Sequence, residues 1–344
     1  MSAETHYLDA VESEENGDFD TAIEHAEKAV SIDPEHSDAW WMIASLYAPD
    51  GKYPDIVQAS KAVSACKKVV EIDETRVDAW VKCGRLMVDH LGMHEQALGW
   101  WQSCREVAPL ESVPIIEQVT ILSDLGMYVE ARDRLAALFE ESLDIGNSQL
   151  ARISQLHKTL EKAAEQDPRS HFRPEQKNHP GWTAIKMRCH KPPVSENMIF
   201  MMTTVPFLMA EVFISRGIFG DGWKGFCLTS ILILVTVLFG MSFTRKIYQR
   251  VNKPGFNLLR AMQMEASCAR VLIPDDIRNS KLYMYLYSRH PPAFQQRIEK
   301  IAQSEKRLQK GWKIKLPDFE SHLDEIGYIE DTDDDENLKG YEEE

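Results

Sequence analysis

Residues 16–40 read NGDFDTAIEHAEKAVSIDPEHSDAW, and this stretch decides the fold. It contains, in order, the small residues Gly17, Ala22, Ala26 and Ala29, then a proline, Pro34, and then an aromatic residue, Trp40. Small residues at helical spacing let two antiparallel helices approach closely, and a proline ends the second of them. The stretch therefore predicts a tightly packed pair of short helices.

The same order of residues recurs along residues 1–166. The second copy has its matching positions at Trp40, Ala44, Tyr47, Gly51, Ala62, Cys66 and Val69. The third has them at Trp80, Gly84, Met87, Gly92, Ala97, Trp101, Cys104 and Pro109, and the degenerate fourth at Ile115, Val119, Leu122, Gly126, Ala131, Leu135 and Leu138. Recurrence in register favours a stack of helix pairs over an unrelated helical bundle. An amphipathic segment, residues 148–164, is predicted to close the stack.

These copies resemble the tetratricopeptide (TPR) repeat, a helix pair with a period of about 34 residues. The first copy departs from the family at His6, and the second carries an insertion in its turn, between Ala48 and Ser60. The resemblance implies an α-solenoid without a catalytic centre, whose concave groove binds an extended or helical peptide.

In the TPR family, outward positions of each first helix line the groove. Carried over to this sequence, these positions are Tyr7, Val11, Trp41, Ser45, Val81, Arg85, Ile116 and Thr120. Arg85 is the only base among them, and Glu4, Asp38 and Asp78 stand beside them. We therefore expect a protein or peptide ligand that is basic or apolar. For Trp41 an alternative role is to pack against its neighbours.

A second informative stretch, residues 225–244, reads GFCLTSILILVTVLFGMSFT and contains no charged residue. A helix needs about 20 apolar residues to cross the hydrocarbon layer of a membrane. The earlier stretch MIFMMTTVPFLMAEVFIS, residues 198–215, has a similar length but contains Pro206 and Glu211. The nearness of the two stretches predicts a transmembrane helical hairpin, and the alternative is a pair of buried helices in a soluble domain.

Basic residues flank the two apolar stretches on the sides that lead to the chain ends. They are Lys186, Arg188, Lys191, Arg245, Lys246, Arg250 and Lys253. The positive-inside rule then places both termini in the cytoplasm, with Arg245 and Lys246 at anionic lipid headgroups. A carboxylate such as Glu211 is costly inside a span. We consider three roles for it: pairing with Arg216, contact with another subunit, or a position near the membrane interface.

Residues 282–301, LYMYLYSRHPPAFQQRIEKI, resemble the C-terminal signature of the membrane-embedded zinc metalloproteases related to HtpX and the CAAX prenyl proteases. In that family a Glu-Ala-Asp helix after a membrane hairpin supplies a zinc ligand, and here Glu265, Ala266 and Ser267 stand in that place. The chain has no HExxH sequence, which would hold zinc and activate water. The resemblance implies at most an inactive scaffold, and the alternative is a chance similarity in a basic helical domain.

The whole chain has 344 residues, a formal net charge of −15, 44% hydrophobic residues and 27% charged residues. These values exclude disordered and collagenous chains, and six cysteines are too few to form a disulfide scaffold. The net charge combines an acidic first half, a basic middle and an acidic end. Because the basic residues flank apolar stretches, we expect binding to membrane lipid and not to nucleic acid. We expect no metal, cofactor or catalytic site.

We therefore predict an all-α protein: a TPR α-solenoid, then a two-helix transmembrane hairpin, then a small helical C-terminal domain. The predicted segments are a solenoid over residues 1–166, a linker over 167–196, the hairpin over 197–244, a basic helical juxtamembrane domain over 245–316 and an acidic disordered tail over 317–344. The predicted function is that of a membrane-anchored adaptor or scaffold that recruits protein partners at the cytoplasmic face, without enzyme activity. Two alternatives are an inactive relative of the membrane zinc metalloproteases and an accessory subunit of a membrane transport or secretion complex.

Overall fold

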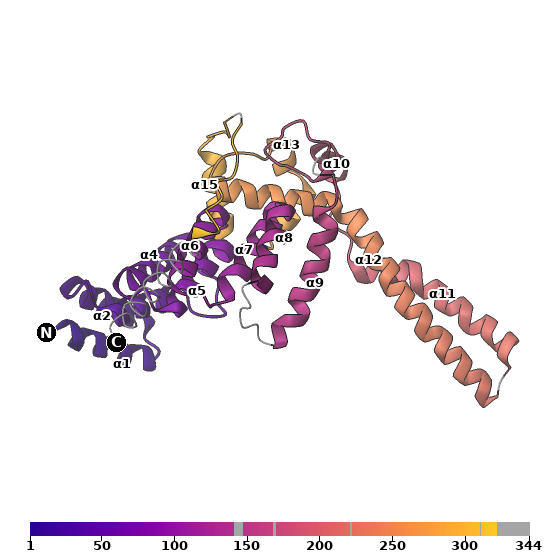
Figure 1. Ribbon diagram of the computed structural model, residues 1–344, viewed down its shortest axis with the longest axis horizontal. Helices are drawn as coiled ribbons and strands as arrows, with labels where there is room; N and C mark the ends of the chain where they lie inside the picture. Colours follow the sequence, from indigo (N-terminus) through magenta and orange to yellow (C-terminus); the bar gives the residue numbers. More distant parts are fainter. Residues whose placement is uncertain (141–146, 168–169, 221, 310, 322–344) are drawn as a thin grey trace, which may run out of the picture. The chain divides into compact units, whose positions relative to one another are not determined.

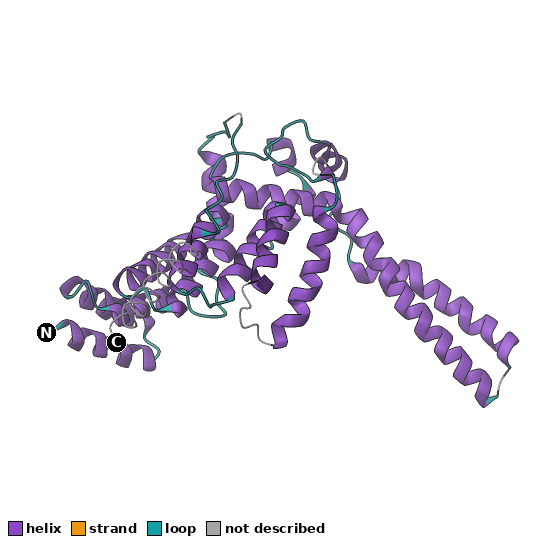
Figure 2. Ribbon diagram, in the orientation of Figure 1, coloured by secondary structure: helices purple, strands orange, loops and turns teal. Residues whose placement is uncertain are grey.

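The computed structural model describes residues 1–140, 147–167, 170–220, 222–309 and 311–321 (Figure 1). Helix accounts for 74% of the structure, and the described residues contain no strand (Figure 2). One isolated bridge joins Val271 and Arg307. The prediction of an all-α protein is therefore confirmed. The predicted acidic tail lies outside the described residues from position 322 onward.

The chain folds as two compact units. Unit 1 comprises Met1–Gln176, Arg260–Ile273 and the chain from Ser288 onward, and unit 2 comprises Lys177–Leu259 and Pro274–Tyr287. The predicted segments 167–196 and 245–316 are therefore each divided between the units. One reason is helix α12 (Trp223–Cys268), which has 46 residues and contains Pro254 in its interior. Consequently no helix end separates the apolar stretch from the basic segment that follows it.

Unit 1 begins with a row of helices that follow one another along the chain. Their bounds are α1 (Ala3–Glu15), α2 (Phe19–Ile32), α3 (Ser37–Tyr47), α4 (Ile56–Ile72), α5 (Val77–Arg85), the π-helical turn η1 (Leu86–His90), α6 (His94–Val107), α7 (Val113–Leu125), α8 (Tyr128–Glu140) and α9 (Asn147–Ala164). Each of them packs against the next one along the chain, as the ribbons from indigo to magenta show (Figure 1). We call this row the helix array.

Small residues hold the helices of the array at close range. Ala22, Ala26 and Ala29 are inaccessible to solvent. A β-carbon on Gly84 would lie 2.3 Å from Cζ2 of Trp101, so α5 and α6 can approach this closely only because the residue is glycine. The small residues that recur in the sequence therefore mark the packed side of the helices.

Two turns of the array repeat one hydrogen-bond geometry. The indole N–H of Trp40 donates to the carbonyl of Pro34 at 2.9 Å. In the same way, the indole N–H of Trp80 donates to the carbonyl of Glu74 at 2.8 Å. Each tryptophan thus satisfies a carbonyl in the turn that precedes its own helix. The first two junctions between copies therefore share local geometry as well as composition.

Later parts of the chain complete unit 1. The last turns of α12 supply Arg260, whose Nε donates to the carbonyl of Asp124 at 3.1 Å. Helix α15 (Pro292–Gln303) packs against α4 and η1, where Gln296 accepts a hydrogen bond from the amide of Ile56 at 3.1 Å. Residues 311–321, further along the chain, contact α6 and α8.

Unit 2 contains α10 (Pro180–Arg188), α11 (Glu196–Phe219), the first part of α12, α13 (Asp275–Arg278) and α14 (Lys281–Tyr287). Helices α11 and α12 lie side by side (Figure 1), and Oγ1 of Thr203 lies 3.5 Å from Oγ1 of Thr244. At the start of α11, the side chain of Asn252 donates to the carbonyl of Val194 at 2.8 Å and accepts from its amide at 2.9 Å. These bonds fix the segment before α11 to the middle of α12.

Candidate functional site

The helix pair α11 and α12 reverses the usual distribution of side chains. Large apolar side chains are exposed along both helices; examples are Met202, Phe207, Phe213, Leu234, Val235 and Phe239. The side on which the helices meet buries small or hydroxyl-bearing residues instead, among them Thr204, Gly240 and Thr244. A β-carbon on Gly240 would lie 2.3 Å from Cγ2 of Thr204. The contact between these helices therefore depends on close backbone approach.

Both helices are long and apolar enough to cross a membrane. Their most apolar windows have mean hydropathies of 1.8 and 2.3, and only 17% of the first window and 6% of the second is buried. A core helix of a soluble domain would bury such residues. Helix pairs in lipid use small residues at their contact, because lipid supplies no hydrophobic force that drives helices together. This exposure argues against the alternative of two buried helices in a soluble domain.

The charged residues predicted for the membrane region have different surroundings. Oε1 of Glu211, inside α11, is buried and has no hydrogen-bond partner among the residues that the structure describes. The side chain of Arg216, one partner considered for it, lies outside the described part. Nε of Arg245 lies 4.0 Å from Oε1 of Glu196 in the first turn of α11, and Lys246 is exposed.

The predicted groove residues lie on alternate helices of the array. Tyr7 and Val11 are on α1, Trp41 and Ser45 on α3, Val81 and Arg85 on α5, and Ile116 and Thr120 on α7. The apolar ones are partly buried and pack against the core, whereas Arg85 is exposed and pairs with Glu117 at 3.4 Å. Their role in ligand binding stays a prediction.

Trp41 packs against its neighbours, which is one of the two roles considered for it. The cations of Arg76 and Lys82 also lie over its ring, 5.4 and 5.8 Å from the ring centroid. Arg76 in addition pairs with Asp38 at 2.9 Å and with Asp78 at 3.2 Å. Two of the acids that suggested a basic ligand are thus already paired within the array.

The structure contains a buried polar network on α6, α7 and α8 that the sequence analysis does not predict. Nε of Arg134 donates to Oε1 of Gln118 at 2.7 Å, and Nε2 of Gln118 donates to Oε1 of Gln102 at 3.2 Å. All three side chains are buried, and buried polar groups are stable only when they are hydrogen-bonded. The one pattern in the sequence that indicates them is that these polar residues recur every 16 residues among apolar core positions.

This network holds a stretch of the same chain. Nη1 of Arg134 donates to the carbonyl of Phe319 at 3.2 Å, and the guanidinium carbon lies 5.1 Å from the Phe319 ring centroid. Nε2 of Gln102 donates to Oγ of Ser321 at 2.9 Å, and that hydroxyl donates to Oε1 of Glu106 at 2.6 Å. The apolar side chains of Trp312, Ile314, Leu316 and Phe319 also pack against the core. The helix array thus already carries a distant stretch of its own chain, residues 311–321, which we call the C-terminal segment.

The residues that resemble the zinc proteases are held by local contacts. Oε2 of Glu265 accepts hydrogen bonds from the amides of Leu272 and Ile273, each at 2.8 Å. The ring of His290 stacks on Phe294 with centroids 4.1 Å apart, and burial lowers the pKa of His290 to about 4. Within the described residues, neither belongs to a group of three side chains that could hold a metal ion; the group of this kind lies on α1 and α2.

The sequence matches no known protein-family model, and no curated protein matches it either. The resemblances to TPR repeats and to membrane zinc proteases therefore rest on the residues quoted for them.

Proposed function

We propose that this chain is a membrane-anchored adaptor. In this proposal α11 and α12 form a transmembrane hairpin, and the helix array is a TPR α-solenoid that binds a protein or peptide partner beside the membrane. The observation that carries the proposal is the reversed burial of α11 and α12. Each Å² of apolar surface left in water costs about 25 cal/mol, and lipid around these helices removes that cost.

The helix array supports the second half of the proposal. The same hydrogen-bond geometry at Trp40 and Trp80 supports a tandem repeat, and a row of helix pairs presents long surfaces to extended chains. The C-terminal segment, which is bound on α6 and α8 and not on the helices of the predicted groove, shows that the array also holds a distant stretch of its own chain. Anchoring would raise the effective concentration of the array for partners on the same membrane.

Basic residues around the spans support a cytoplasmic array. Arg245 and Lys246 follow the second apolar stretch directly, where they would contact anionic headgroups. The positive-inside rule then keeps both chain ends, and with them the array, in the cytoplasm.

Partner binding by the groove is tested with paired lysine substitutions. Ser45→Lys with Thr120→Lys adds two positive charges to the predicted groove on α3 and α7, and these charges should repel a basic ligand and obstruct an apolar one. Ser60→Lys with Ser64→Lys is the matched control, because both serines are exposed on α4. Affinity purification of the detergent-solubilised full chain should lose its partners only with the groove variant. If the same proteins accompany both variants, the groove is not the recruiting surface.

A second candidate function, a subunit of a membrane complex, is favoured by Glu211. Its buried Oε1 lacks a hydrogen-bond partner among the described residues, and carboxylates inside spans commonly contact another polar group. Glu211→Leu should then abolish assembly of the complex, measured as particle size in mild detergent, while the helix array keeps its circular dichroism. Met209→Leu is the control on the same helix, because Met209 is exposed. An unchanged particle size for Glu211→Leu would contradict this function.

A further inference from the structure

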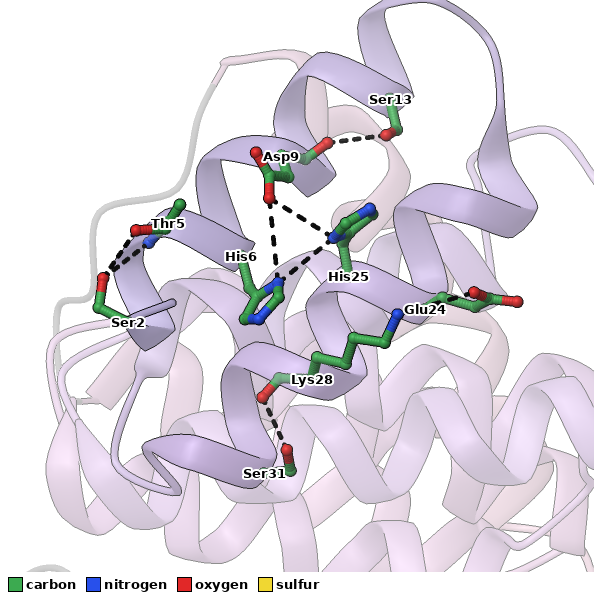
Figure 3. A network of polar contacts seen from close by, with 9 residues as sticks. All are labelled: Ser2, Thr5, His6, Asp9, Ser13, Glu24, His25, Lys28 and Ser31. Carbon is green, nitrogen blue, oxygen red and sulfur yellow. Dashed lines mark hydrogen bonds and ion pairs between the residues drawn. The ribbon is translucent and has the colours of Figure 1, made fainter.

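Three metal-binding side chains meet between the first two helices of the array (Figure 3). His6 and Asp9 stand three residues apart on α1, which places them on the same face of the helix. His25 reaches them from α2. The Nδ1 atoms of His6 and His25 lie 3.4 Å apart, and Oδ2 of Asp9 lies 3.9 Å from the first and 3.7 Å from the second.

These distances can be compared with those that metal ions require. Zinc binds histidine nitrogen at about 2.0–2.1 Å in a tetrahedral arrangement, so two of its donor atoms lie about 3.3–3.4 Å apart. An octahedral ion bound by two histidines and a carboxylate would bring neighbouring donors to about 3 Å. The histidine pair already has the tetrahedral separation. The carboxylate of Asp9 needs to move by only a few tenths of an ångström to complete the set.

The three donors are accessible and are not committed to other groups. His6, His25 and Asp9 keep 15%, 25% and 32% of their side-chain surface exposed, so that solvent reaches all three. Among the described residues, the three donor atoms have polar contacts only with one another (Figure 3). Ser13 donates to the main-chain carbonyl of Asp9 and leaves its carboxylate unused. Lys28, the nearby base, lies 3.9 Å from Glu24.

The position of the cluster gives it a structural consequence. Helix α1 buries only Ala3 and Ala10, and alanine contributes little apolar surface. An ion that joins α1 to α2 would therefore add a cross-link between the two helices to the burial of these small side chains.

We propose that His6, Asp9 and His25 form a zinc site that fastens α1 to α2. Zinc is coordinated by Nδ1 of each histidine and by one carboxylate oxygen of Asp9, and water occupies the fourth position. Two imidazoles and a carboxylate form a donor set that zinc favours. The TPR resemblance and the membrane proposal are not needed for this inference, which stands on the geometry of the three side chains.

Metal binding is measured on the detergent-purified full chain carrying an affinity tag without histidine. After removal of metal and addition of zinc, we expect about one zinc ion per chain by elemental analysis. Competition with a zinc-sensitive dye should show that His25→Ala weakens binding by about 100-fold or more, since the loss of even an indirect contact to a metal ligand costs about 10–100-fold. Zinc should also raise the thermal unfolding midpoint of the wild type but not that of the variant.

Two further variants make the result decisive. Asp9→Asn keeps the shape of the side chain and removes its charge, so it should also weaken binding even if His25→Ala fails to fold. His157→Ala is the matched control, because Nδ1 of His157 lies 3.6 Å from Oε2 of Glu161 and no third donor joins them among the residues that the structure describes. Zinc bound equally by the wild type and by Asp9→Asn would overturn the proposal. Zinc binding that is lost only on Glu265→Ala or His290→Ala would overturn it as well.

Cobalt substitution tests the proposed geometry separately. The intensity of the visible absorption bands distinguishes four-coordinate from six-coordinate cobalt. We expect the four-coordinate spectrum for the wild type and its loss for Asp9→Asn. A six-coordinate spectrum would contradict the tetrahedral zinc site.

Discussion

The helix array and the helix pair α11 and α12 have the same secondary structure but opposite surfaces. The array buries aliphatic and aromatic side chains such as Leu98, Trp101 and Leu122, and it is rich in ion pairs at its surface, for example between Arg76 and Asp38. The helix pair exposes its large apolar side chains and buries small ones. The two regions therefore share their secondary structure and differ in which side chains they bury.

Both regions nevertheless use glycine to bring helices together. A β-carbon on Gly84 would meet Trp101 at 2.3 Å, and one on Gly240 would meet Thr204 at the same distance. In the array the glycine makes room for a large aromatic ring, so that hydrophobic burial rewards the contact. In the helix pair the glycine makes room for a small side chain, so that the two helix backbones pack directly against each other.

The largest effect should come from charges on the exposed face of α12. Leu234→Arg with Val235→Arg places two guanidinium groups near the middle of the apolar stretch, where each costs about 2.5–3.5 kcal/mol of insertion free energy. The exposed fractions of these residues are 58% and 56%. We expect the variant to be lost from the carbonate-resistant membrane fraction.

The matched control places the same charges on the array. Ile32→Arg with Val57→Arg changes residues that are 51% and 58% exposed, and surface substitutions there should cost less than about 1 kcal/mol. The control should stay in the membrane fraction. If both double variants stay there equally, the exposed face of α12 does not meet lipid.

The second-largest effect is a pH dependence of the stability of unit 1. Burial lowers the pKa of His94 from 6.5 to about 4, although the hydrogen bond from its Nδ1 to the carbonyl of Gly92 acts in the opposite direction. In the unfolded chain the imidazole of His94 takes up a proton near pH 6.5, whereas in the folded chain it does so only near pH 4. The free energy of unfolding therefore has its full value above pH 6.5 and falls by about 3 kcal/mol as the pH drops to 4.

His94→Gln should remove that pH dependence in part. Urea unfolding at several pH values would show a smaller loss between pH 6.5 and 4 than in the wild type, and the remaining loss reflects His290, whose pKa burial also lowers to about 4. His157→Gln is a control at a partly exposed position. Equal slopes for all three proteins would contradict a neutral, buried His94.

A third effect tests the glycine contacts of the array. Gly84→Ala forces a β-carbon against the Trp101 ring, and overpacking of this kind costs about 2 kcal/mol. Gly99→Ala is the matched control, because a β-carbon there meets no atom within 4 Å and alanine favours the helix by up to about 1 kcal/mol. Urea midpoints should therefore move in opposite directions. A Gly84→Ala variant as stable as Gly99→Ala would show that α5 and α6 are not held in this close contact.

Local periodicity was sufficient to predict the all-α class and the two apolar helices. It placed a boundary after residue 244, because Arg245 and Lys246 end the apolar stretch. The structure continues α12 to Cys268, since side-chain polarity changes there without any change in backbone conformation. Pro254 does not end the helix either, which a rule based on proline alone would not anticipate.

Contacts between distant residues explain what the sequence could not show. His6 departs from the TPR pattern, but the side chain that it meets, His25, lies on the next helix, and this contact is apparent only when α1 and α2 are packed. The same holds for Arg134, which meets Phe319 from the far end of the chain. Helical spacing identifies the face on which a residue lies, and it does not identify the segment that covers this face.

The smallest effect concerns the C-terminal segment. Arg134→Ala removes the donor that holds the carbonyl of Phe319 and leaves Oε1 of Gln118 without that bond. Loss of a hydrogen bond to a charged group costs about 1.5 kcal/mol or more, which corresponds to about tenfold faster opening. Hydrogen exchange should therefore accelerate in the C-terminal segment, for example at the Lys315 amide, which donates to Oε1 of Glu95 at 3.2 Å.

Arg132 provides the control for this experiment. It lies on the same helix, but it pairs at the surface with Asp133 at 2.6 Å, and exposed pairs contribute about 0.2–1 kcal/mol. Arg132→Ala should leave exchange in the C-terminal segment unchanged. If Arg134→Ala leaves it unchanged as well, apolar packing of Trp312 and Phe319 holds the segment without the polar network. Hydrophobic contact would then be the main interaction that holds the C-terminal segment on α6 and α8.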